Sequence, residues 1–103
     1  MLKLSLLAGG LLAASSLVAT SVHAAEVSGE MLAQTCSGCH GTFGKIKNNA
    51  FMPLAGMNAN TFVNTMKEFA SGARPGTLMG PLAKGFTDDE LKRMADYFAA
   101  QKP

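Results

Sequence analysis

Residues 34–56, QTCSGCHGTFGKIKNNAFMPLAG, contain the motif on which the fold of this chain depends. Two residues separate Cys36 from Cys39, and His40 follows directly. These are the only two cysteines among the 103 residues. Such a pattern is compatible with a metal site, a thiol–disulfide pair or a covalent cofactor attachment. The rest of the chain distinguishes between these three kinds of site.

The first 24 residues have the composition of a secretory leader. Lys3 precedes an apolar run from about Leu4 to Ala14, and small residues end at Ala24, where we expect cleavage. An uncleaved membrane anchor is the alternative, but the apolar run is shorter than the roughly 20 residues that a spanning helix needs. We therefore expect an exported chain, periplasmic if the source is bacterial, with a signal peptide over 1–24 and one mature domain over 25–103.

The expected mature domain is small and weakly charged. Its 79 residues carry a formal charge of +1, against +2 for the whole chain, because Lys3 leaves with the leader. No basic run interleaved with aromatic residues indicates a nucleic-acid partner. A domain of this size usually needs a disulfide, a metal or a cofactor to complete its core.

The cysteine motif is best explained as a haem attachment site. A structural zinc ion needs four ligands, whereas the mature chain offers two cysteines and one histidine. A redox dithiol belongs near a βαβ pattern, and the sequence has no convincing strand; a local disulfide is a further alternative. In an exported chain, C-x-x-C-H predicts one covalent haem c, with thioether bonds to Cys36 and Cys39 and with His40 as the proximal iron ligand.

The apolar pattern predicts an all-α domain, in which about three helices and two long loops surround the haem. The first helix is expected from about Ser28 to Cys36. A second is expected over 59–71, capped by Asn58 or Asn60 and ended by Gly72. The inward faces of the second and third helices are expected to be formed by Phe62, Met66, Phe69 and Ala70, and by Leu91, Met94, Ala95 and Phe98.

The third helix has the clearest start signal. Thr87 and Glu90 have the spacing of a capping box, and Asp88 and Asp89 favour the positive end of the helix dipole. The two loops are expected over 41–57 and 72–86.

A methionine is the expected second axial ligand, because the mature chain has no second histidine. Its six methionines are Met31, Met52, Met57, Met66, Met79 and Met94. Met66 and Met94 fit helix cores, and Met31 is expected to pack against the last helix. We predict Met79, in a loop rich in glycine and proline that can reach the face opposite His40, with Met52 as the runner-up.

These motifs together resemble those of single-haem class I c-type cytochromes, and the resemblance covers all 79 mature residues. The motifs are CSGCHG (36–41), PLAG (53–56), TLMGPLAKGF (77–86) and TDDELKRMADYFA (87–99). The resemblance implies that the backbone carbonyl of Pro53 binds the other ring nitrogen of His40 and orients the imidazole. The methionine loop and last helix are most similar to the cytochrome subunit of flavocytochrome c sulfide dehydrogenases, which implies a flavoprotein partner.

The chemistry expected is single-electron transfer rather than catalysis. The sequence has no paired carboxylates, no Ser/His/Asp set and no phosphate-binding glycine loop, so sulfide chemistry would belong to a separate flavin subunit. A freely diffusing respiratory carrier is one alternative. A gas-binding sensor, in which a small molecule displaces Met79, is another.

A partner surface is expected near the exposed haem edge. Phe43, Ile46 and Leu78 are the apolar candidates for it, although each fits a core position equally well. The basic residues that either steer an acidic partner or only solubilise the chain are Lys45, Lys47, Lys67 and Lys84.

Overall fold

The computed structural model describes residues 9–10, 18–21, 24–47 and 50–103, and this part of the chain forms helices and no strands. The predicted all-α fold is confirmed. Most of the predicted leader lies outside the described residues. Within them, no helix has both the length and the apolar character needed to cross a bilayer.

Three short helices follow one another at the amino-terminal end of the domain: α1 (Gly29–Ala33), η1 (Gln34–Cys36) and α2 (Ser37–His40). Ser28 caps α1, because its hydroxyl accepts a hydrogen bond from the Met31 amide at 3.1 Å. The prediction that this helix ends near Cys36 was wrong, since the helical path continues through the whole cysteine motif. It ends at Gly41, whose φ of 85° few other residues adopt.

The remaining helices are η2 (Thr42–Gly44), α3 (Ala59–Ser71), α4 (Met79–Ala83) and α5 (Asp88–Ala99). Asn58 caps α3 through its side-chain oxygen, and Gly72 ends that helix with a φ of 82°. Thr87 and Glu90 form the predicted capping box at the start of α5, with bonds of 2.8 and 3.2 Å. These predicted limits are confirmed.

The second predicted loop was wrong in one respect, because it contains the short helix α4. Met79 is the first residue of this helix rather than a loop residue. Pro81 had suggested irregular backbone, but a proline is tolerated in the first helical turn, where its missing N–H would have had no partner.

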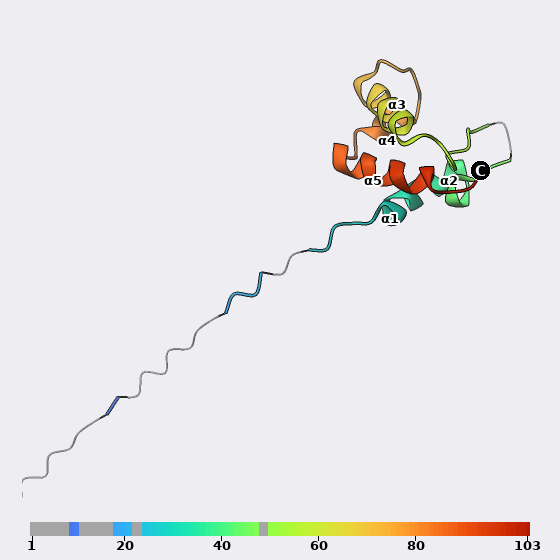
Figure 1. The fold of residues 1–103 in the computed structure, drawn as a ribbon. Coiled ribbons are helices and arrows are strands. Elements are labelled where there is room, and N and C mark those ends of the chain that lie inside the picture. The colour runs from blue at the N-terminus through green and yellow to red at the C-terminus, as the bar shows by residue number, and fades with distance from the viewer. Residues whose placement is uncertain (1–8, 11–17, 22–23, 48–49) are drawn as a thin grey trace, which may run out of the picture.

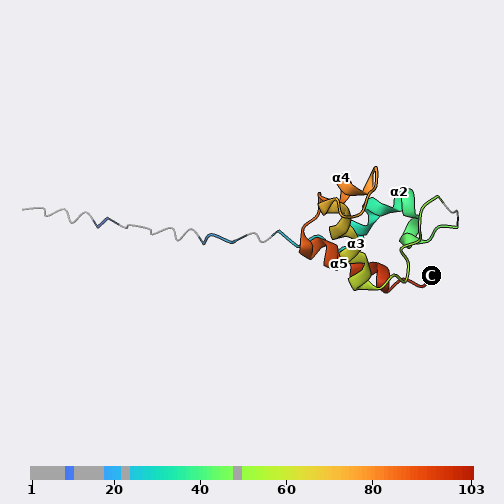
Figure 2. The same ribbon diagram turned by 90° about the horizontal axis from the view of Figure 1, so that it is seen from above.

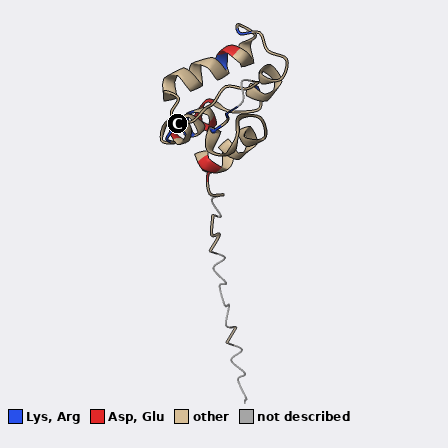
Figure 3. Ribbon diagram, turned by 90° about the vertical axis from the view of Figure 1, so that its right-hand side faces the viewer, with Lys and Arg blue, Asp and Glu red and all other residues tan. Residues whose placement is uncertain are grey.

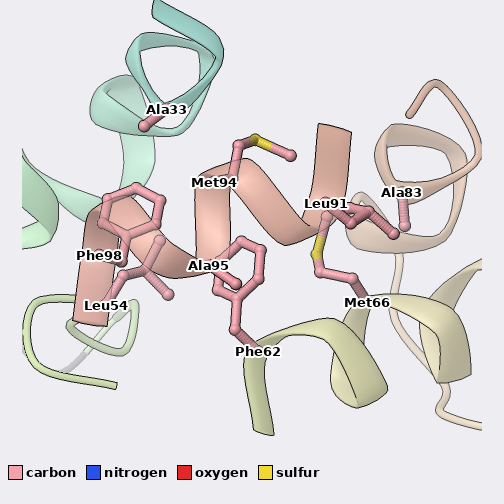
Figure 4. Packing of buried hydrophobic residues seen from close by; sticks show 9 residues of the cluster. All are labelled: Ala33, Leu54, Phe62, Met66, Ala83, Leu91, Met94, Ala95 and Phe98. Carbon is pink, nitrogen blue, oxygen red and sulfur yellow. The ribbon is translucent and has the colours of Figure 1, made fainter. Parts of the chain in front are cut away.

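Helix α5 lies at the centre of the domain, between α1 on one side and α3 with α4 on the other (Figure 1). Its inward face packs against side chains from all three helices and from the loop before α3 (Figure 4). The buried core consists of Ala33, Leu54, Phe62, Met66, Ala83, Leu91, Met94, Ala95 and Phe98. The predicted inward face of α5 is confirmed, as are Phe62 and Met66 on α3.

The contact between α1 and α5 is unusually close. A Cβ atom added to Gly29 would lie 2.2 Å from the backbone oxygen of Arg93, so only glycine fits there. The Arg93 guanidinium donates a hydrogen bond to the carbonyl of Val27 and pairs with Asp89 at 3.2 Å. Met31, expected to pack against α5, instead has 64% of its surface exposed, because α1 presents Gly29 and Ala33 to that helix.

Candidate functional site

A cavity of about 380 Å³ is lined by the cysteine motif, α3 and α4. The cavity is lined by residues of both α2 and α4, which Figures 1 and 2 show as separate segments of the ribbon. Its walls are formed by Thr35, Cys36, Cys39, His40, Ala50, Phe51, Met52, Leu54, Met57, Phe62, Thr65, Met66, Phe69, Leu78, Met79, Leu82 and Phe86. Among these described residues there is no lysine, arginine, aspartate or glutamate, so the cavity suits a large apolar group.

Both cysteines line this cavity as free thiols, Cys36 half-buried and Cys39 exposed. Burial raises the pKa of the Cys36 thiol, against the effect of the Thr35 hydroxyl 3.8 Å away, and the neighbouring Cys39 raises it further. The described residues contain no cluster of three or more His, Cys, Asp or Glu side chains that would hold a metal ion by themselves.

One ring nitrogen of His40 is hydrogen-bonded, and the described residues provide no hydrogen-bond partner for the other. Its Nδ1 lies 2.7 Å from the carbonyl oxygen of Met52, which can only accept, so Nδ1 carries the proton and donates. The Nε2 atom therefore keeps its lone pair for a metal. The Phe51 ring also contacts the imidazole edge-on, with centroids 6.0 Å apart.

The carbonyl of Pro53 was expected to accept the hydrogen bond from His40. The structure shows that the carbonyl of Met52 accepts it instead. Pro53 is exposed and does not line the large cavity. Proline restricts the conformation of the residue that precedes it, and here that residue provides the carbonyl. Pro53 thus directly follows the residue whose carbonyl contacts the ring.

Four methionines line the cavity, so position alone does not select one as a ligand. Met52 lies on the histidine side, because its own carbonyl is bonded to the ring. Met66 is only 5% exposed in the core, and Met57 packs against the same core. Met79 begins α4, the helix that lies away from α2 in both views (Figures 1 and 2).

Several known proteins are similar to the chain, although no protein-family model matches it. The chain is 36% identical over 73 residues to the cytochrome subunit of sulfide dehydrogenase from Chlorobaculum tepidum, covering 71% of this chain and 66% of that one. The chain is 32% identical over 77 residues to cytochrome c-554(548) of Halomonas halodenitrificans, and the match covers 72% of this chain and 93% of that relative. It is 30% identical over 103 residues to cytochrome c-553 of Helicobacter pylori, and that match covers 98% of this chain and 100% of the relative.

The chain is a c-type cytochrome. It therefore carries one covalent haem c and transfers electrons rather than acting as an enzyme. It spans about two thirds of the sulfide dehydrogenase subunit, and it covers 31% of a second relative, the thiosulfate dehydrogenase electron acceptor of Stutzerimonas stutzeri.

The cavity of this cytochrome fits a haem. Its walls are apolar, its two thiols lie one helical turn apart on η1 and α2, and the imidazole beside them has a free nitrogen. These are the donors that covalent attachment and axial ligation require.

The three apolar residues predicted to contact a partner lie at different distances from the cavity. Leu78 lines the cavity and is 61% exposed, whereas Phe43 is exposed away from it, with a φ of 59°. Ile46 lies in a second, shallower hollow beside Pro53. Phe51 and Leu82 are further exposed apolar residues at the cavity that the sequence did not indicate, because an apolar pattern without a clear period does not distinguish rim from core.

The charged residues of the cytochrome are scattered along a mostly uncharged ribbon (Figure 3). Of the four lysines singled out from the sequence, Lys67 pairs with Asp88 at 3.0 Å and so joins α3 to α5. Lys45, Lys47 and Lys84 are exposed and have no ion pair within the described residues.

Proposed function

We propose that this cytochrome is a periplasmic electron carrier whose haem is attached to Cys36 and Cys39 and whose iron lies between His40 and Met79. One observation carries the proposal: all four side chains line the same apolar cavity, from elements on both sides of it. We propose further that residues 1–24 are removed on export, so that the mature chain begins at Ala25.

The bound haem supplies an iron that alternates between the ferric and ferrous states. The chain provides the surroundings that set the reduction potential of this iron. The Met52 carbonyl holds the His40 imidazole, and the apolar walls exclude water. The thioether of Met79 favours the ferrous state and raises the potential relative to two histidines. With His40 and Met79 as its ligands, the iron would have no position open to a substrate.

We propose a flavoprotein as the electron donor, as in a sulfide dehydrogenase. The sulfide dehydrogenase subunit of Chlorobaculum tepidum supports this partner by its similarity. The cavity also has an exposed apolar rim on which a partner can dock, formed by Phe51, Met52, Leu78 and Leu82. The lysines that have no ion pair among the described residues, Lys45, Lys47 and Lys84, would steer an acidic partner toward the molecule.

A freely diffusing carrier is the second candidate, and the similarity to cytochrome c-553 supports it. The alignment with cytochrome c-553 covers 98% of this chain and 100% of the relative, whereas the sulfide dehydrogenase subunit extends well beyond the match. The two candidates share the site and differ only in whether the partner stays bound.

Purification of the native cytochrome from its source tests both candidates. We expect a low-spin spectrum that carbon monoxide does not change, and a mass that corresponds to residues 25–103 with one haem. Flavin that co-elutes with the haem would support the subunit, and a flavin-free monomer would support the free carrier. A spectrum that responds to carbon monoxide would overturn the electron carrier in favour of a gas sensor.

A further inference from the structure

The segment between α3 and α4 is folded back onto the last turn of α3 by one residue, Arg74. Its backbone amide donates to the carbonyl of Glu68 at 3.1 Å. Its guanidinium bonds the Glu68 carboxylate through Nε and Nη2, both at 3.0 Å. The same guanidinium lies over the Phe69 ring, 5.7 Å from its centroid, within the range of a cation–π contact.

Phe69 connects this contact to the haem cavity. Its ring lines the cavity, and a Cβ added to Gly76 would lie 3.0 Å from that ring and 3.8 Å from the Cβ of Met79. A Cβ added to Gly80 would lie 3.4 Å from the Phe69 carbonyl oxygen. Phe69 is therefore in contact with the Arg74 guanidinium and lies close to Gly76 and Gly80, the glycines on either side of Met79.

Few other contacts hold the 72–78 segment in place. Every residue from 71 to 78 is exposed, so no buried side chain anchors it to the core. Its position depends on the last turn of α3 and on the contacts of Arg74.

From these contacts we infer that Arg74, together with Glu68, is a positioning residue for the axial methionine. It holds the Phe69 ring and the 72–78 segment so that α4 keeps the Met79 sulfur on the iron. This role rests on the proposed ligation by Met79. Loss of the Arg74 contacts leaves the helices in place and releases only the ligand.

Exchange of the axial ligand in the ferric, haem-loaded protein measures this role directly. Added imidazole binds the iron only when Met79 is off it, so its apparent affinity follows the fraction of released methionine. The exchange is followed by loss of the weak far-red charge-transfer band of methionine-ligated ferric haem. We expect R74A to raise the apparent affinity on the order of threefold to tenfold, from the lost ion pair and cation–π contact. We expect R74K to give a smaller increase, because lysine keeps the charge but not the planar fork.

The matched control is K92A, which breaks the exposed Lys92–Asp96 pair of 3.2 Å on α5, away from the 72–78 segment. Its imidazole affinity should equal that of the wild type. Circular dichroism would verify that all variants stay folded at the imidazole concentrations used. If R74A binds imidazole no more tightly than K92A while the wild type shows the band, the positioning role is wrong and the ligand assignment stands. A wild-type protein without the band would overturn the Met79 assignment and the positioning role with it.

Discussion

The two sides of the haem cavity are built in different ways. On the His40 side, the thiols and the imidazole lie within five consecutive residues of η1 and α2, and the ring is held by the Met52 carbonyl and the Phe51 ring. On the opposite side, Met79 begins a five-residue helix after an exposed segment and depends on packing against α3.

This difference in construction suggests that one side serves to attach the haem and the other to set its potential. The His40 side is local in sequence and, in the proposed attachment, would be joined to the haem by two covalent bonds. The Met79 side is assembled from distant segments and, if Met79 is the ligand as proposed, would be the side that the fold can release. We therefore expect changes on the His40 side to affect whether a haem protein forms, and changes on the Met79 side to affect its potential and ligand exchange.

The largest effect is expected from His40→Ala. Without the imidazole, the attached haem has no proximal ligand, so little normal haem-loaded protein should accumulate. Haem-stained gels and absorption spectra of periplasmic extracts measure this, with Ser37→Ala in the same motif as a control that should mature normally. An unchanged low-spin spectrum from His40→Ala would contradict the assignment.

Met79→Leu should leave the fold intact but remove one ligand of the iron. Leucine keeps the volume and apolarity, so the stability cost should stay below about 1.5 kcal/mol. The far-red band should disappear, the potential should fall, and carbon monoxide should bind the ferrous protein. Met52→Leu and Met66→Leu should keep the band; its loss in Met52→Leu alone would mean that the first loop provides the ligand.

The same contrast explains how much the sequence could predict. Cys36, Cys39 and His40 form a local motif, and the caps of α3 and α5 are local signals, so these predictions needed no tertiary information. The acceptor for His40 was missed by one residue, because the direction of a carbonyl depends on the course of the whole loop. Neither α4 nor the role of Arg74 had a local signal, since a short helix is stabilised by its packing.

Gly29→Ala tests whether the His40 side depends on the scaffold beneath it. The added methyl group would lie 2.2 Å from the Arg93 carbonyl and would force α1 away from α5. We expect a loss of about 1–3 kcal/mol in the free energy of unfolding, measured by urea titration, with the far-red band retained. Gly38→Ala, where nothing lies within 4 Å, should show no such loss. Equal free energies of unfolding for Gly29→Ala and Gly38→Ala would mean that α1 and α5 can move apart without loss of stability.

The smallest effect is expected from Phe51→Leu. The variant removes the edge-on ring contact with His40, worth about 0.5–1.5 kcal/mol, but keeps the Met52 hydrogen bond. Stability should fall slightly while imidazole exchange stays unchanged, because Met79 is on the other side. Phe43→Leu, exposed and outside the cavity, is the control. Faster exchange in Phe51→Leu would show that the two sides are coupled.

The closure of α1 against α5 also sets an order of assembly. The Arg93 side chain bonds a carbonyl 66 residues earlier, so the contact between the two ends of the domain can form only after most of the domain has been made. A chain that is made or exported amino-terminus first presents residues 29–40 to solvent until residues 88–99 have followed. During that interval both thiols remain open to reaction. The contact that closes α1 against α5 is therefore the last of these to become possible, and until then the two thiols are accessible for cofactor attachment.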